Sequence, residues 1–223
     1  QRQVVQQLLQ IVGGTTIGYK IACTNSSAQA LLGMDAPVFG RLISPLVFEN
    51  GSQLPAADFH IRCVEAEFAF TMGADVPERS TPYDAGSILP LVDAAMPSIE
   101  IVDHHFTDWT TVGGLQVAAD NAIHGCWIPG SPCAEWCDLD LARQQVQLLV
   151  NGQVSTTGSG ANVLGQPLNV LAWLANELPQ FGLALKAGDR ITTGITTDVY
   201  LAEAGDQLRA DFGPLGEVRV SFV

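Results

Sequence analysis

The sequence predicts an α+β fold that is mainly β, with a mixed β-sheet and few helices. Most of the chain consists of short runs of β-forming residues bounded by Gly, Pro, Asn or Asp. Only two segments have the pattern expected of a well-formed helix. No linker, repeat or change of composition divides the 223 residues, so we expect a single domain over 1–223 with one hydrophobic core.

The predicted strands follow from the alternation of apolar and polar side chains. Residues 17–24, 59–73 and 98–106 alternate in this way and are rich in β-forming residues. Asn151-Gly152 separates two further strand-like segments and is a strong signal of a β-hairpin. Three more strands are expected between residue 185 and the C-terminus, where Ala-Gly-Asp and Pro/Gly turns separate them.

The helical segments are predicted from their end signals. Residues 26–33 begin with a serine cap and stop at a glycine, and residues 166–182 place apolar side chains on one face before Gly182. The first twelve residues have the pattern of a short amphipathic helix that ends at Gly13-Gly14. Because the chain starts partway through this pattern, we expect the N-terminal helical segment to be incomplete.

Composition and charge narrow the possible partners. The chain has 10 Lys+Arg against 23 Asp+Glu, a formal charge of −13, which repels phosphate backbones and anionic lipid. No apolar run reaches the roughly 18 residues of a membrane span, and no secretory signal opens the chain, so we predict a cytoplasmic protein without nucleic-acid or membrane partners. Five cysteines, an odd number, argue against a disulfide framework.

Three glutamates form the candidate metal site. Glu65 and Glu67 lie two residues apart in a predicted strand, so their side chains project from the same face, about 7 Å apart. This pair alone is better explained by a solvent-facing surface or by pairing with Arg62 and Arg41 than by a metal site. Glu100, between two isoleucines in another predicted strand, changes the balance because a carboxylate is rarely placed there without a partner. We therefore predict a site for a hard divalent cation, Mg²⁺ or Mn²⁺, held by these three carboxylates.

Lys20 is one of only two lysines and lies between Tyr19 and Ile21 in a predicted strand. A desolvated ammonium near a metal can pair with a substrate carboxylate or stabilise an enolate oxygen. The alternative is a lysine at a strand end that extends to water.

The histidines are candidate acid/base groups, since imidazole titrates near neutral pH. His104 and His105 are adjacent, so at most one of them shares a face with Glu100. His124 also belongs to a possible zinc set with Cys126, Cys133 and Cys137. Their spacing matches structural zinc sites only loosely, so ordinary buried or loop thiols are the preferred interpretation.

Several segments, taken in order over essentially the whole chain, carry a resemblance. They are GYKIACTNSSAQALLGMDAPVFG, RCVEAEFAF, IEIVD, ADNAIHG, VLGQPLNVLAWLANEL, LKAGDRITTG and AGDQLRADFGPLGEVRVSF. Through these segments the sequence is similar to the 2-keto-4-pentenoate hydratase/4-oxalocrotonate decarboxylase group of the fumarylacetoacetate hydrolase superfamily. The resemblance implies the β-roll of the superfamily's C-terminal domain, a Mg²⁺ or Mn²⁺ ion, 2-oxo acid substrates and assembly into a homo-oligomer.

The resemblance also implies roles for individual residues. Glu65, Glu67 and Glu100 match the metal ligands, Lys20 matches the lysine of the GYKIG motif, and Thr193 and Thr197 lie where hydroxyls meet the substrate. The pattern departs from the hydratases at Val38 in place of an aspartate, at Thr110 after Trp109, and at Ile123-His124. The residues expected to move protons are therefore altered, and His124 is a candidate substitute.

From this resemblance we expect a metal-dependent lyase that adds water to a 2-hydroxy-2,4-dienoate to give a 4-hydroxy-2-oxo acid. Decarboxylation of a 2-oxo diacid and hydrolysis of a carbon-carbon bond in an acylpyruvate are alternatives at the same metal. A non-catalytic partner subunit is a third alternative, because expected proton-transfer residues are missing.

Overall fold

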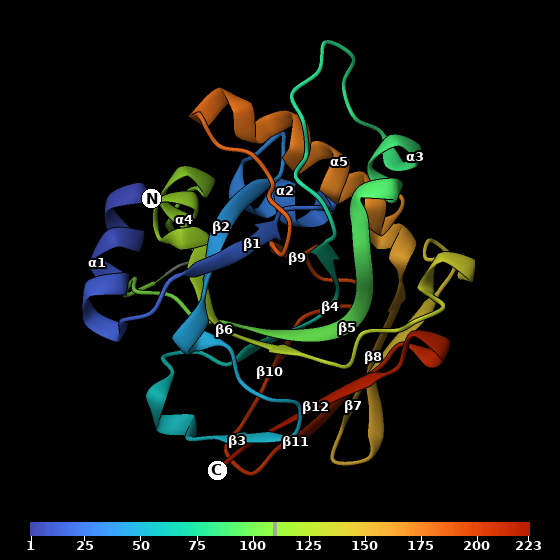
Figure 1. Ribbon diagram of the computed structural model, residues 1–223. Coiled ribbons are helices and arrows are strands. Elements are labelled where there is room, and N and C mark those ends of the chain that lie inside the picture. Colours follow the sequence, from blue (N-terminus) through green and yellow to red (C-terminus); the bar gives the residue numbers. More distant parts are fainter. Residues whose placement is uncertain (109–110) are drawn as a thin grey trace.

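The computed structural model describes residues 1–108 and 111–223, and its architecture is two mixed β-sheets with few helices (Figure 1). The larger sheet has seven strands in the order β2-β1-β9-β4-β5-β6, and β10 pairs with β4. Its strands are β1 (Thr16–Ala22), β2 (Val38–Ile43), β4 (Cys63–Met72), β5 (Val92–Val102), β6 (His124–Pro129), β9 (Arg190–Thr192) and β10 (Tyr200–Leu201).

The smaller sheet has five strands in the order β3-β12-β11-β7-β8. In Figure 1 it lies below the strongly curved β5, opposite the long helix α5. Each sheet contains one parallel pair, β1 with β9 and β3 with β12, and the other pairs are antiparallel. The strands are β3 (Ser52–Leu54), β7 (Gln145–Val150), β8 (Gln153–Ser159), β11 (Gln207–Asp211) and β12 (Glu217–Phe222).

The predicted helices are confirmed with small corrections. The helix α2 (Ser26–Leu32) is capped by Asn25, whose side chain accepts from the Ala28 amide at 2.8 Å, rather than by a serine. The helix α5 (Pro167–Glu177) continues as a 3₁₀ turn to Phe181 before Gly182. The N-terminal helix α1 (Arg2–Val12) ends at Gly13 as expected. Two short helices, α3 (Ala85–Ile88) and α4 (Gly114–Ala119), were not predicted because four and six residues show no helical period.

The predicted strands are also found, and the hairpin at Asn151-Gly152 joins β7 to β8. The strand β5 begins at Val92, six residues before the expected start. Pro97 lies inside it and breaks the strand pattern of the sequence. No helix in the described residues is long and apolar enough to cross a membrane.

The main hydrophobic core fills the space between the two sheets and α5 (Figure 1). Alternate residues of β4 point into it; Phe68, for example, meets Phe212 edge-to-face with ring centroids 5.0 Å apart. Tyr19 and Ile21 of β1 and Ile99 and Ile101 of β5 belong to the same core, all buried. Side chains between these residues must therefore point to the opposite face of the seven-stranded sheet, and that face carries the charged residues.

Candidate metal centre

Glu65, Glu67 and Glu100 meet on the face of the seven-stranded sheet that points away from the main core. Antiparallel pairing of β4 with β5 places Glu65 directly opposite Glu100. One carboxylate oxygen from each residue lies within 4.8 Å of the others. Within residues 1–108 and 111–223 this is the only group of three or more His, Cys, Asp or Glu side chains with such spacing. The structure thus brings together the three predicted ligands.

Two of these carboxylates are held through one oxygen each. Glu67 Oε2 accepts from the Gly194 amide at 2.8 Å, and Glu100 Oε1 accepts from His124 Nδ1 at 2.8 Å. The other oxygens, Glu67 Oε1 and Glu100 Oε2, are buried and have no hydrogen-bond partner among residues 1–108 and 111–223. Buried carboxylate oxygens normally have a partner, and a hard divalent cation supplies one. The three residues therefore fit Mg²⁺ or a similar ion.

Burial and mutual repulsion act on the pKa values of these carboxyls. Burial raises the pKa of Glu67 well above its usual value, and the charges of Glu100 and Glu65 raise it further. Burial also raises the pKa of Glu65, which is partly exposed. For Glu100, burial acts in the same direction, but Lys20 and His124 outweigh it and the pKa is lowered. The site is thus built to keep Glu100 ionised, while Glu67 needs a further positive charge.

Lys20 is buried beside Glu100. Its Nζ lies 3.1 Å from Glu100 Oε1 and donates to the Ala122 carbonyl oxygen at 2.9 Å. The side chain is only 1% exposed, which excludes the alternative in which the lysine extends to water. Burial would lower its pKa, but the neighbouring carboxylates outweigh this effect and the pKa is raised. Lys20 is therefore held as an ammonium next to the candidate metal ligands.

His124 also contacts Glu100, and its buried Nε2 has no hydrogen-bond partner in the described part of the chain. Its position depends on a register shift between β5 and β6, which lies between Ile101 and Val102. By contrast, the zinc alternative that included His124 finds no support in the described residues. Cys126 is buried in the main core, Cys133 is half-buried and Cys137 is exposed, and they form no metal-sized group with His124.

The turn 193–197 lies beside Glu67. Gly194 adopts a φ of +88°, which favours glycine, and this turns its amide toward the carboxylate. A Cβ at position 194 would collide with the Thr24 hydroxyl, so this turn packs closely against the end of β1. The Thr193 hydroxyl is buried and donates to the Phe68 carbonyl oxygen at 3.1 Å, whereas the Thr197 hydroxyl donates to the Asp198 carbonyl oxygen at 3.0 Å.

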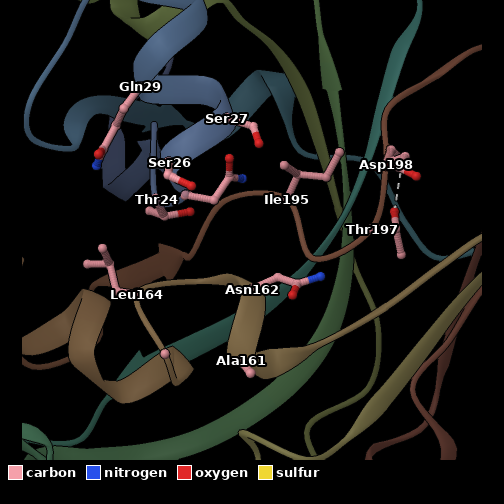
Figure 2. A pocket seen from close by; sticks show the side chains of 12 residues that line it. Thr24, Ser26, Ser27, Gln29, Ala161, Asn162, Leu164, Ile195, Thr197 and Asp198 are labelled. Carbon is pink, nitrogen blue, oxygen red and sulfur yellow. Dashed lines mark hydrogen bonds between the residues drawn. The ribbon is translucent and has the colours of Figure 1, made fainter.

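A cavity of about 540 Å³ opens next to this turn. Figure 2 shows the side chains of the 24–29 segment facing those of the 161–165 segment across it, with Ile195, Thr197 and Asp198 at one side. The cavity lies close to Glu67 through two of its lining residues. Thr24 packs against Gly194 and Ile195 follows it in the chain, and the Gly194 amide donates to Glu67. Its other lining residues are Asn25, Ser26, Ser27, Gln29, Ala161, Asn162, Leu164 and Gly165.

The remaining candidates do not belong to the group of three carboxylates or cannot act as acids. His105 is exposed and pairs with Asp120 at 2.8 Å, and the amide of Phe106 donates to His104 Nδ1 at 3.2 Å. Val38 packs with Cys23 and Ala122 in an apolar cluster. Ile123 packs in another such cluster, and the expected departure at Thr110 lies outside the described residues. Neither Val38 nor Ile123 can move a proton.

The sequence did not reveal two contributors to this site. The Gly194 amide is a main-chain donor, and only the glycine-threonine pattern of 192–197 hinted at it. The Ala122 carbonyl oxygen accepts from Lys20 because an irregular turn directs it there, and no sequence pattern indicated this turn.

Comparison with known proteins agrees with the geometry. Residues 16–223 match the family model of the fumarylacetoacetate (FAA) hydrolase C-terminal domain. The chain is 32% identical over 211 residues to a 2-keto-4-pentenoate hydratase of Paraburkholderia xenovorans, covering 95% of this chain and 77% of that protein. It is also 32% identical over 218 residues to a 2-hydroxyhexa-2,4-dienoate hydratase of Comamonas testosteroni, with 97% and 81% covered.

The fold is similarly close to a solved structure. A 4-oxalocrotonate decarboxylase from Pseudomonas putida G7, complexed with magnesium and adipate, superposes with a TM-score of 0.91 at 27% identity. The match covers 98% of this chain and 82% of the decarboxylase. Together, the family match, the identity to relatives over most of their length, and the shared fold confirm the predicted resemblance. The chain belongs to the fumarylacetoacetate hydrolase family of enzymes, in the group that includes the 2-keto-4-pentenoate hydratases.

Proposed function

We propose that the protein is a divalent-metal-dependent hydratase that converts a 2-hydroxy-2,4-dienoate to a 4-hydroxy-2-oxo acid. The observation that carries this proposal is the group of three carboxylates, two of whose buried oxygens have no partner among the described residues. The chain is also 32% identical to a 2-keto-4-pentenoate hydratase and to a 2-hydroxyhexa-2,4-dienoate hydratase. Glu65, Glu67 and Glu100 are the proposed ligands. Their all-oxygen donor set favours Mg²⁺ or Mn²⁺ over softer metals.

The bound cation would supply Lewis-acid stabilisation of the negative charge that develops on the 2-oxo oxygen. Lys20, fixed as an ammonium beside Glu100, adds a second positive charge for the substrate's carboxylate or enolate oxygens. Thr197 lines the cavity, and Thr193 lies in the same turn, where it helps to shape the substrate-binding wall. These residues would orient the acid end of the substrate.

The reaction requires proton transfers and the addition of water. The enol proton leaves the 2-hydroxyl, C5 gains a proton, and a hydroxyl then adds at C4 while C3 gains a proton. We propose His124 as one carrier of these protons, because its Nε2 is free while Nδ1 is fixed on Glu100. This assignment compensates for Val38 and Ile123, which cannot act as acids or bases.

The cavity favours a monoacid substrate over a diacid. None of the described residues that line it is Lys, Arg or His, and Asp198 contributes a carboxylate. A second substrate carboxylate would therefore be desolvated without a cation beside it. The related decarboxylase structure, by contrast, is a complex with adipate, which is a diacid. The cavity of this chain supports hydration of a dienoate with an uncharged tail instead.

Spectroscopy of the purified protein tests this proposal. With Mg²⁺ or Mn²⁺ it should remove the absorbance of 2-hydroxypenta-2,4-dienoate and form 4-hydroxy-2-oxopentanoate, and chelation should stop the reaction. Release of CO₂ from 4-oxalocrotonate would favour the decarboxylase alternative, and two acid products from an acylpyruvate would favour hydrolysis. No turnover, together with co-purification of an aldolase or decarboxylase, would favour a partner subunit.

Homo-oligomeric assembly and a cytoplasmic location remain predictions for gel filtration and fractionation.

A further inference from the structure

A left-handed turn of three residues precedes β6 and contacts the candidate site. Asn121, Ala122 and Ile123 have φ angles of 54°, 54° and 52°, and none is glycine. Side chains other than glycine rarely adopt this conformation, and three in succession are disfavoured unless the surroundings impose them. Such strained segments persist where the structure around them determines their geometry, often at functional sites.

The Asn121 side chain provides this constraint. Its Oδ1 accepts from the Arg41 amide at 2.7 Å, and its Nδ2 donates to the Arg41 carbonyl oxygen at 3.0 Å. Asn121 is 1% exposed, so water does not compete for either bond. Gly40 completes the fit, because a Cβ at that position would collide with the Asn121 carbonyl oxygen. The turn is therefore fixed to β2 by a two-bond amide clamp.

The clamped turn holds two groups of the candidate site. The Ala122 carbonyl oxygen accepts from Lys20 Nζ at 2.9 Å, and Lys20 lies opposite Gly40 in the pairing of β1 with β2. Immediately after the turn, His124 Nδ1 bonds to Glu100 Oε1 at 2.8 Å. Lys20 and His124 thus meet the same carboxylate oxygen, and the turn sets the position of both.

We propose that Asn121 is a positioning residue whose clamp on the Arg41 backbone keeps the turn in place and so fixes Lys20 and His124 on Glu100. This inference rests on the proposed metal-dependent hydratase, because it concerns how that site is held. Asn121 itself touches neither ligand nor substrate in this account. Its effect passes through main-chain atoms of the turn.

Two substitutions separate the clamp from the backbone conformation. Asn121→Gly keeps a residue that favours positive φ but removes both bonds, and Asn121→Asp keeps the shape but cannot donate to the Arg41 carbonyl oxygen. Asn176→Ala is a matched control, because Asn176 makes the same two-bond clamp on the backbone of Tyr83, at 2.7 and 2.9 Å. Tyr83 precedes α3 and packs in the main core, so this control clamp is outside the candidate site.

The readouts are Mg²⁺ affinity by calorimetry without substrate, kcat and KM per Mg²⁺-binding site, and Tm. Both Asn121 variants should weaken Mg²⁺ binding about tenfold and lower kcat roughly 10- to 100-fold, with KM less affected. Asn176→Ala should lower Tm yet leave affinity and kcat within about twofold of the wild type.

Two results would overturn the role of the clamp. If Asn121→Gly kept the wild-type affinity and kcat, the left-handed backbone alone would suffice; if both variants only lowered Tm, as the control does, the role would be structural. If the wild type bound Mg²⁺ without hydrating a dienoate, the hydratase proposal would fail. The Mg²⁺ affinities of the Asn121 variants would still show whether the clamp positions Lys20 and His124. A wild type that bound no Mg²⁺ would overturn both.

Discussion

Glu65 and Glu100 lie directly opposite each other on the antiparallel strands β4 and β5, with Glu67 one pleat further along. Like charges opposite each other destabilise a sheet, and burial of Glu67 and Glu100 increases the cost. A bound cation would convert this repulsion into three attractive contacts. The stability of the protein should therefore depend on metal.

Metal addition gives the first prediction. Mg²⁺ at about 100 times its Kd should stabilise the folded protein by about 2.7 kcal/mol, which raises Tm by roughly 5–10 °C for a chain of this size. Glu65→Gln should largely remove the shift and the metal-dependent turnover, whereas Glu135→Gln, at an exposed position, should retain both. Scanning calorimetry with and without Mg²⁺ measures the effect, and an unchanged shift in Glu65→Gln would remove that residue from the ligand set.

The two lysines give a second, internally controlled prediction. Lys20→Met should lower kcat by about 100- to 1,000-fold, because it removes the buried ammonium beside Glu100. Lys186→Met should leave kcat within about twofold, since Lys186 forms an exposed ion pair with Asp75 at 3.0 Å. Steady-state kinetics at saturating Mg²⁺ compares them. Equal kcat values for the two variants would contradict the role of Lys20.

The charge of the cavity predicts substrate preference. The wild type should favour a monoacid dienoate over the corresponding diacid by about 100-fold in kcat/KM, which is the effect of one desolvated carboxylate without a partner. Ser27→Arg places a cation at the cavity wall and should narrow this preference, while the uncharged Ser27→Gln should not. Competition between the two substrates measures the ratio. A wild type that prefers the diacid would refute this account of the cavity.

Asp206 predicts a pH dependence of stability away from the metal. Burial would raise its pKa, but hydrogen bonds from the Glu203 amide, the Tyr200 hydroxyl and the Asn151 amide group outweigh burial and lower it below the usual 3.8. A lowered folded-state pKa stabilises the protein above pH 3.8, and this contribution is lost as the pH falls through the folded value.

The change that tests this is Asp206→Asn. At pH 7 this substitution should reduce the free energy of unfolding by about 1–3 kcal/mol. Near pH 3 the difference in free energy of unfolding between variant and wild type should be smaller. Urea unfolding at both values measures it, with Asp138→Asn as an exposed control. If this difference in free energy of unfolding became larger at low pH, it would contradict a lowered pKa of Asp206 in the folded state.

The fold and the proximity of the three candidate metal ligands were accessible from the sequence because they follow period-two patterns. The alternation around Glu65 and Glu67 and the isoleucines beside Glu100 placed these carboxylates on one face of each strand. The contact of His124 with Glu100 was not accessible, because it depends on a register shift in the pairing of β5 with β6. The turn at 121–123 escaped prediction because left-handed backbone is normally signalled by glycine, and here tertiary contacts impose it instead.

The burial of Lys20 against Glu100 also has a consequence for the order in which ligands arrive. With its carboxylates ionised, the group of three glutamates and one ammonium carries a formal charge of −2. An anionic 2-oxo acid approaching this group alone would be repelled, in a protein whose formal charge is already −13. A divalent cation brings the group to neutrality, so catalysis should follow compulsory ordered addition, with metal entering before substrate.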